Sequence, residues 1–173
     1  MNVKRIVILA VVALLVCLVC TSCGGGPVSA VKGFMRAFMQ GDAKRINVYL
    51  DEDMQIPDEV SNIWEEMDEI DMGFDMDIKD YKKAMGKTLG SAKYELKDQE
   101  DDEATVKVIL DLKSFAQAML RAVKDKELRK EMAEELKDAD EDDFIEKGTF
   151  ELELIDGKWL ITDMRGLSLF YMF

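Results

Sequence analysis

Apolar and polar residues follow two different periods along this chain. Helical spacing, with an apolar residue at every third or fourth position, is found along residues 27–40, 43–50, 60–70, 80–89 and 114–138. Alternating spacing, which is typical of a strand with one buried face, is found along residues 92–96, 105–112, 150–154 and 158–164. The order of these segments predicts N-terminal helices, then two strand hairpins with a helical insertion between them.

The first predicted helix has well-marked ends. Pro27 suits the first turn of a helix, where its missing N–H costs nothing. Gly41 predicts the end of this helix, and Asp42 is expected to cap the short helix that follows. The apolar stripe of the first helix consists of Val31, Phe34, Met35, Phe38 and Met39. Such a stripe indicates ordinary core packing.

Each predicted hairpin has one apolar face. The acidic loop "DQEDDE" joins the first pair of strands, and "DG" at 156–157 makes a tight turn in the second. Tyr94 is the only titratable residue among the expected inward positions, and Asp163 alone keeps the register of Trp159 at the end of the last strand. Every Asp and Glu on the first three strands is expected to point outward. The inward positions are Ala92, Tyr94, Leu96, Val106, Val108, Leu110, Leu112, Phe150, Leu152, Leu154, Trp159 and Ile161.

Two further apolar segments complete the pattern. The helical insertion can divide in two at "KDKE", residues 124–127, and the tail "GLSLFYMF" is apolar enough to close the sheet as an edge strand or to tuck beneath it. The inward residues expected on the insertion are Phe115, Met119, Leu120, Val123, Leu128, Met132 and Leu136.

The N-terminus has the pattern of a secretory signal peptide. Lys4 and Arg5 precede fifteen uninterrupted apolar residues, Ile6 to Cys20. As a helix this run would span roughly 22 Å, less than the ~30 Å hydrocarbon core of a bilayer. The next charge comes only at Lys32, so a transmembrane anchor remains an alternative, as does ordinary cleavage without lipid.

The stretch "CTSC" favours lipid attachment, because it resembles the bacterial lipobox. Ser22 is small enough to precede a lipidated Cys23, whereas bulky Val19 stands before Cys20. Cleavage between Ser22 and Cys23 divides the chain into a signal peptide (1–22), a lipidated cysteine with a flexible leash (23–27) and one domain (28–173). The mature domain would then stand at the extracytoplasmic face of the cell membrane without a free thiol or a disulfide.

The charge composition excludes some functions. The formal net charge is −13, so the surface repels phosphate backbones and a nucleic-acid partner is not expected. The chain has no histidine, which removes the commonest general base and the commonest metal ligand. We therefore expect a protein that is not an enzyme.

Two short motifs resemble ligand-binding loops without completing them. "MGKTLG" at 85–90 contains the Gly-Lys-Thr of a phosphate loop, but Tyr81 stands where that loop needs glycine. "DADEDDFIEKGT" at 138–149 begins like a calcium loop, but Asp143 and Thr149 replace its required glycine and glutamate. No cofactor, metal site or catalytic residue is predicted.

The mature chain resembles the nuclear-transport-factor-two-like superfamily, also described as SnoaL-like or lumazine-binding-like, and within it an uncharacterised lipoprotein branch. The opening "VSAVKGFMRAFMQGDAKRINVYL" and the closing "FELELIDGKWLITDM" carry the resemblance. It implies an α+β, cone-like fold in which a curved antiparallel sheet wraps around the first helix, often with a pocket at the wide end. The insertion at 114–145 is longer than the basic cone needs and could cover that pocket.

These features together predict a lipid-anchored binding module for a small apolar or aromatic ligand, or for another envelope component. Phe34, Phe38, Tyr94 and Trp159 are the candidate pocket-lining residues, with Trp159 beside Ile161 on the core face of its hairpin. Two alternatives remain open. One is a SnoaL-like enzyme that uses a pocket Asp or Tyr as acid or base, and the other is a structural interaction module with no pocket.

Overall fold

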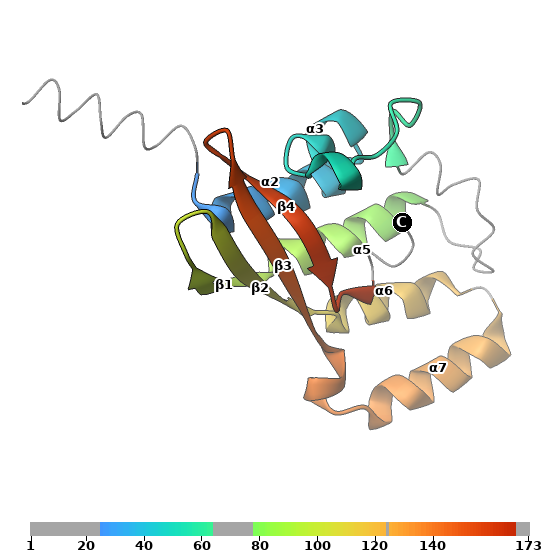
Figure 1. The fold of residues 1–173 in the computed structure, drawn as a ribbon. Coiled ribbons are helices and arrows are strands. Elements are labelled where there is room, and N and C mark those ends of the chain that lie inside the picture. The colour runs from blue at the N-terminus through green and yellow to red at the C-terminus, as the bar shows by residue number, and fades with distance from the viewer. Residues whose placement is uncertain (1–24, 64–77, 124, 169–173) are drawn as a thin grey trace, which may run out of the picture.

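The computed structural model describes residues 25–63, 78–123 and 125–168. A four-stranded antiparallel sheet in the order β1-β2-β3-β4 curves around the N-terminal helices (Figure 1). The elements are α2 (Pro27–Gln40), α3 (Ala43–Asn47), the 3-10 turn η1 (Glu52–Met54), α5 (Ile78–Gly90), β1 (Lys93–Gln99), β2 (Glu103–Asp111), α6 (Lys113–Ala122), α7 (Lys126–Asp138), the 3-10 turn η2 (Glu141–Phe144), β3 (Ile145–Ile155) and β4 (Lys158–Arg165). This confirms the predicted α+β, cone-like class with a helical insertion between two hairpins.

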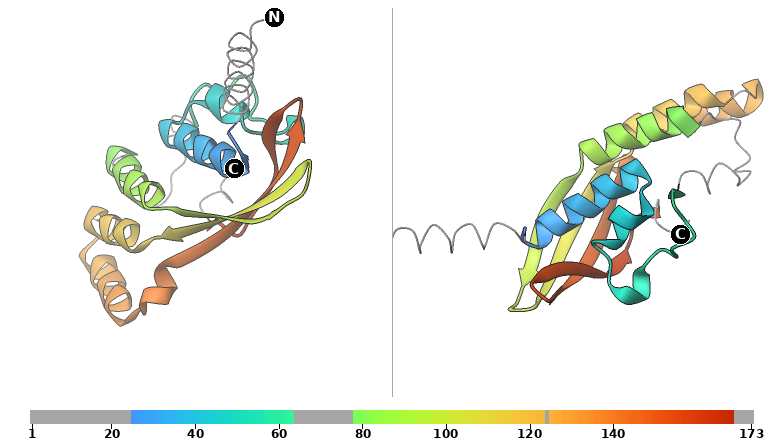
Figure 2. Two further views of the ribbon diagram at one scale, coloured as in Figure 1. Left: turned by 90° about the vertical axis from the view of Figure 1, so that its left-hand side faces the viewer. Right: turned by 90° about the horizontal axis from the view of Figure 1, so that it is seen from above.

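The helices form a row that begins on the sheet and leads away from it. Helix α2 lies on the concave face, α5 packs beside α2, α6 beside α5 and α7 beside α6 (Figure 2). Helix α7 is therefore the element furthest along this row from the core of the sheet. None of the helices in the described ranges is both long enough and apolar enough to cross a membrane.

Helix α2 begins and ends where the sequence predicts. Pro27 occupies its first turn, and Gly41 ends it with φ 73°, a left-handed conformation that favours glycine. Its apolar stripe is buried except at Met39, which is partly buried. Asp42 accepts a hydrogen bond from the Arg45 N–H at 3.1 Å as the N-cap of α3. The predicted helix at 60–70 is wrong at its start. Val60 is not helical, Ile63 is both helical and buried, and residues 64–70 lie outside the described ranges.

The segment after α3 ties the helices to the last strand. The side-chain amide of Asn47 both donates to and accepts from the backbone of Ile56, at 2.8 Å in each case. Leu50 forms a parallel bridge with Ile161, whose N–H donates to the carbonyl of Tyr49 at 2.8 Å. These bonds hold α3 beside β4.

The core face of the sheet is mostly as predicted, with Val106, Val108, Leu110, Phe150, Leu152 and Ile161 buried. Two of the expected inward residues keep the inward register but are not buried: Leu96 is 46% exposed and Leu154 is 37% exposed. Leu96 lies on the edge strand β1 beside a register shift, and Leu154 comes two residues before the β3–β4 turn. Both occupy the inward alternation, but at margins of the sheet where less of the molecule covers them.

The insertion divides as predicted, because α6 ends at Ala122 and Asp125 caps α7 by accepting from the Leu128 N–H. Val123 is buried between the two helices, but α7 buries no residue fully. The expectation that Leu128 points inward is wrong, since it is 39% exposed. Both helices are amphipathic, but of the two it is α6 that packs against α5, whereas α7 packs mainly against α6.

The start of the tail tucks against the sheet. Gly166 turns the chain with φ 82°, and the buried Leu167 then packs over Gly148. A Cβ atom at Gly148 would lie 2.3 Å from Cγ of Leu167, so this contact requires glycine on β3. Residues 169–173 lie outside the described ranges.

Candidate functional site

Two of the four predicted pocket residues, Phe34 and Phe38, belong to the hydrophobic core. Their ring centroids are 6.2 Å apart, and Phe34 also meets Phe150 edge to face at 5.9 Å. Both side chains are buried. The packing of α2 against β2 and β3 accounts for them, as the apolar stripe of the sequence indicated.

The other two residues, Tyr94 and Trp159, are half-buried against the same core but lie on opposite edge strands, β1 and β4. Trp159 shares the core face with Ile161, as expected. Nζ of Lys32 lies 5.3 Å from the centroid of the Tyr94 ring, a cation–π distance. Burial raises the pKa of Tyr94 above its ordinary value, and the positive charge of Arg36 offsets part of this rise. A pocket lined by all four residues stays a prediction.

The expectation that Asp163 keeps the register of Trp159 is wrong. A β-bulge at Thr162 shifts the pairing of β4, so that Leu152 faces Ile161 whereas Glu151 faces Asp163. One extra residue moves every later side chain to the other face, which places Asp163 outward. There Asp163 forms an ion pair with Arg165, which also reaches Glu151 at 3.3 Å.

The expectation that every acidic residue on the first three strands points outward is also wrong, because of Glu146. Strand β3 begins at Ile145, earlier than the predicted start at Phe150, and Glu146 pairs with the buried Leu110. Its side chain therefore lies on the core face. Oε1 accepts hydrogen bonds from the N–H and hydroxyl of Ser168, while the buried Oε2 has no hydrogen-bond partner among the described residues.

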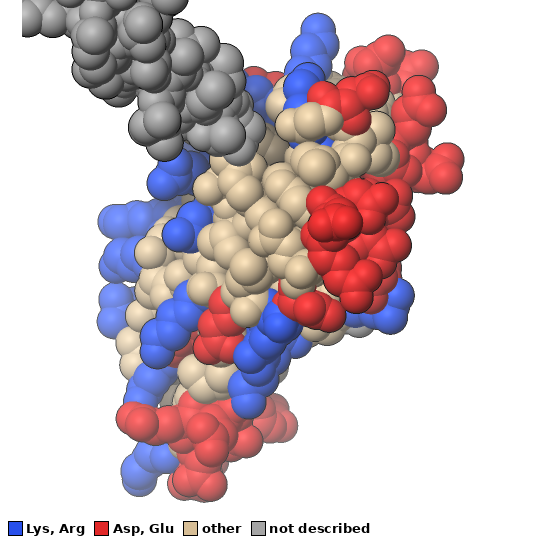
Figure 3. All heavy atoms as spheres, turned by 60° about the vertical axis from the view of Figure 1, so that its left-hand side comes forward, with Lys and Arg blue, Asp and Glu red and all other residues tan. Residues whose placement is uncertain are grey.

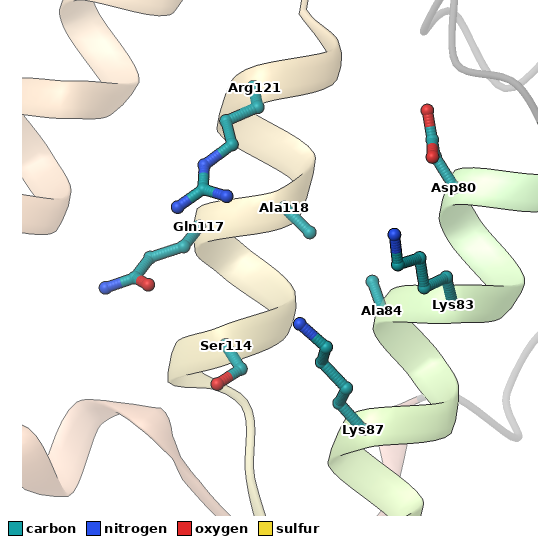
Figure 4. Close-up of a pocket in the computed structure, with 8 residues that line it drawn as sticks. All are labelled: Asp80, Lys83, Ala84, Lys87, Ser114, Gln117, Ala118 and Arg121. Atoms are coloured by element: carbon teal, nitrogen blue, oxygen red, sulfur yellow. The ribbon is translucent and has the colours of Figure 1, made fainter.

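A pocket lies between α5 and α6, away from the predicted residues. Its volume is about 270 Å³, and its lining consists of Asp80, Lys83, Ala84, Lys87, Ser114, Gln117, Ala118 and Arg121. Ala84 and Ala118 lie between the two helices, and the side chain of Lys87 extends from α5 toward α6 (Figure 4). The two alanines let the helices approach, while longer polar side chains form the walls. We call this site the α5–α6 groove.

The α5–α6 groove is positively charged in a chain whose net charge is −13. Lys83, Lys87 and Arg121 line it, opposed by the single carboxylate of Asp80. None of these three cations forms a hydrogen bond or ion pair with another described residue. On the face in Figure 3, Lys and Arg are frequent along one side, and dense clusters of Asp and Glu lie on the other side and at the lower end, where some Lys and Arg adjoin them.

The α5–α6 groove was not predicted from the sequence. Lys83 and Lys87 are four residues apart, and so are Gln117 and Arg121, which places each pair on one face of its helix. That spacing is the only signal in the sequence, and it does not reveal that α5 packs against α6. The groove forms by tertiary contact between segments separated by a hairpin.

The first incomplete motif lies in a helix, and the second includes a 3-10 turn. "MGKTLG" lies within α5, where Thr88 is 1% exposed and its hydroxyl has no partner among the described residues. Asp140 and Asp143 of the calcium-like segment form a capping box around η2. Within the described ranges, no three Asp, Glu or Cys side chains are grouped so as to hold a metal ion. Ser22 and Cys23 lie outside those ranges.

No protein-family model matches the chain, and neither does any curated protein. One solved structure that matches is described as an NTF-2 like protein of unknown function from Shewanella oneidensis MR-1. It is 20% identical over 79% of this chain and 92% of the other, with a TM-score of 0.34. The fold class stated above stands on the order and pairing of this chain's own elements.

Proposed function

We propose that this protein is a bacterial envelope lipoprotein, anchored through Cys23 at the extracytoplasmic face of the cell membrane. The observation that carries the proposal is the order of a basic start, an apolar run and "CTSC". Exposed Gly25 and Gly26 precede Pro27 in the first turn of α2, which supports a leash that ends where the domain begins. Acyl chains on Cys23 would hold the domain close to the bilayer.

Metabolic labelling with a fatty-acid analogue tests the anchor in cells that express the full chain. Cys23→Ala is expected to abolish labelling and to leave the precursor uncleaved, because the modified sulfur would be missing. Cys20→Ala is the matched control and should leave both steps intact. Labelling that depends on Cys20 and not on Cys23 would show that the assignment is wrong.

We further propose that the domain holds a ligand and does not transform one. Support comes from the α5–α6 groove, which presents an open volume and unpaired cations without a paired base and acid. The enzyme alternative gains one residue, Glu146, which lies on the core face. Tyr94, the other titratable residue on this face, lies on the edge strand β1, whereas Glu146 lies on β3 and is separated from it by β2.

Native mass spectrometry of the mature lipoprotein, released from membranes in a mild detergent, tests the binding function. We expect a small molecule to accompany the folded protein and to leave on denaturation, with its mass unchanged after incubation. Recovery of a chemically altered product would favour the enzyme alternative. A spectrum that shows the bare lipoprotein under every condition would favour a structural module.

A further inference from the structure

The α5–α6 groove gathers three cations in one cavity. Lys83, Lys87 and Arg121 form no hydrogen bond or ion pair with another described residue. Asp80 is the single carboxylate in the lining. Lysines elsewhere, such as Lys158, also form no ion pair with another described residue, so the groove is distinguished by the shared position of its three charges. Like charges gathered on two packed helices repel one another, and an anion bound between them would relieve that repulsion.

The geometry of the groove suits a compact anion. Lys87 reaches across from α5 toward the start of α6, where Ser114 lines the same groove (Figure 4). Helix α6 begins at Lys113, whose N–H donates to Oδ1 of Asp111 at 2.9 Å. The next residue, Ser114, lines the groove and has a backbone N–H available for another acceptor. The positive end of the helix dipole and the Ser114 hydroxyl thus add to the charge of the lysines.

The net charge and the volume of the α5–α6 groove indicate which class of ligand it can hold. Three cations against the carboxylate of Asp80 leave the groove with a charge of +2, which matches a dianion. A phosphate monoester carries between one and two negative charges at neutral pH and offers several strong acceptor oxygens. The volume of about 270 Å³ lies just below the usual range for small-molecule pockets, roughly 300–1,000 Å³. A small organic phosphate fits this volume, and the alanine floor can contact its carbon atoms.

We propose that the α5–α6 groove binds a small phosphate monoester, held by Lys83, Lys87 and Arg121 with the Ser114 hydroxyl. This inference rests on the proposed binding role of the domain and is independent of the anchor at Cys23. A long polyanion is a poor candidate, because the acidic remainder of the surface repels it. Gln117 and Asp80 can hydrogen-bond hydroxyl groups elsewhere on the ligand.

Isothermal titration of the detergent-solubilised mature protein tests the proposal with defined probes at constant ionic strength. The probes are inorganic phosphate, glycerol 3-phosphate and a short-chain phosphatidic acid, with succinate as a dianion that lacks phosphorus. We expect saturable binding of glycerol 3-phosphate or phosphatidic acid in preference to succinate. The first of these would identify a soluble ligand and the second a lipid headgroup, and both would support the proposed chemistry.

The triple substitution Lys83→Gln, Lys87→Gln, Arg121→Gln tests the location. Each lost partner removes a charge-assisted hydrogen bond, so we expect affinity to fall by at least about tenfold. The matched control is Lys107→Gln, Lys147→Gln, Lys158→Gln, which removes the same charge from the outward face of the sheet. The control should keep its affinity, and circular dichroism should show both variants folded.

Three outcomes would overturn the proposal. One is the absence of saturable binding for every phosphate probe by the wild-type protein. Another is tighter binding of succinate than of the phosphate esters, which would exclude phosphate as the recognised group. The third is an equal loss of affinity in the groove variant and its control, which would show that net charge alone attracts the probes. None of these results bears on lipid labelling at Cys23, so the anchor is judged separately.

Discussion

On the concave face of the sheet, α2 meets β2 and β3 through fully buried apolar side chains such as Phe34 and Phe150, whereas α5 and α6 face each other across a groove lined by Lys83 and Arg121. The two regions use the same kind of element, an amphipathic helix, in opposite ways. In the first, tight packing leaves the aromatic rings without room for a ligand between them. In the second, two alanines let the helices approach each other, and the longer polar side chains around them enclose an open cavity. The packed core thus depends on α2, whereas the proposed ligand binding depends on α5 and α6.

The largest effect is expected from truncation of the concave core. Phe34→Ala removes a buried ring that contacts both Phe38 and Phe150, so it should lower the free energy of unfolding by about 3–5 kcal/mol. Leu128→Ala on α7 is the control, and it should change stability by about 0.5 kcal/mol or less because that side chain is 39% exposed. Equilibrium denaturant unfolding measures both. Similar losses in the two variants would contradict the division between a packed core and a peripheral insertion.

An intermediate effect is expected where the tail meets β3. Gly148→Ala places a methyl group 2.3 Å from Leu167 Cγ and 3.0 Å from the Arg165 carbonyl oxygen, so the turn at Gly166 must shift. Overpacking of this kind costs about 1–3 kcal/mol. Gly90→Ala is the matched control, because a Cβ there meets no atom within 4 Å. A neutral Gly148→Ala would show that Leu167 does not close this end of the sheet.

The smallest effect concerns Tyr94 at the edge of the concave face. Burial raises its folded pKa, so the neutral phenol is favoured in the folded state. The associated stability is complete below the ordinary tyrosine pKa of about 10, and it is lost as the pH rises through the folded pKa. An ultraviolet titration of phenolate absorbance, with Tyr94→Phe as the difference standard, should therefore show that Tyr94 ionises above the ordinary tyrosine pKa. Arg36→Gln should raise the pKa of Tyr94 further, because the positive charge of Arg36 favours the phenolate. A lower pKa in this variant would contradict that effect.

Much of the architecture can be predicted from the sequence because its signals are local. Pro27 and Gly41 mark the ends of α2, Asp42 caps α3, and alternation identifies the inward faces of β2 and β3. Hydrogen-bond geometry within a helix and the pleat of a strand depend on near neighbours in the chain, so these assignments hold. The pattern of the first 23 residues likewise predicts an anchor from local composition alone.

Tertiary structure decided which of the predicted faces are covered and which residues share a site. The bulge at Thr162 turns Asp163 outward, and the longer β3 brings Glu146 onto the core face, because pairing with a neighbouring strand sets the register. The α5–α6 groove depends on the same kind of contact: Lys87 and Arg121 are separated by a complete hairpin and line one cavity only because α6 packs beside α5. The sequence determined the polar face of each helix, and packing between distant segments determined that the two faces form one pocket.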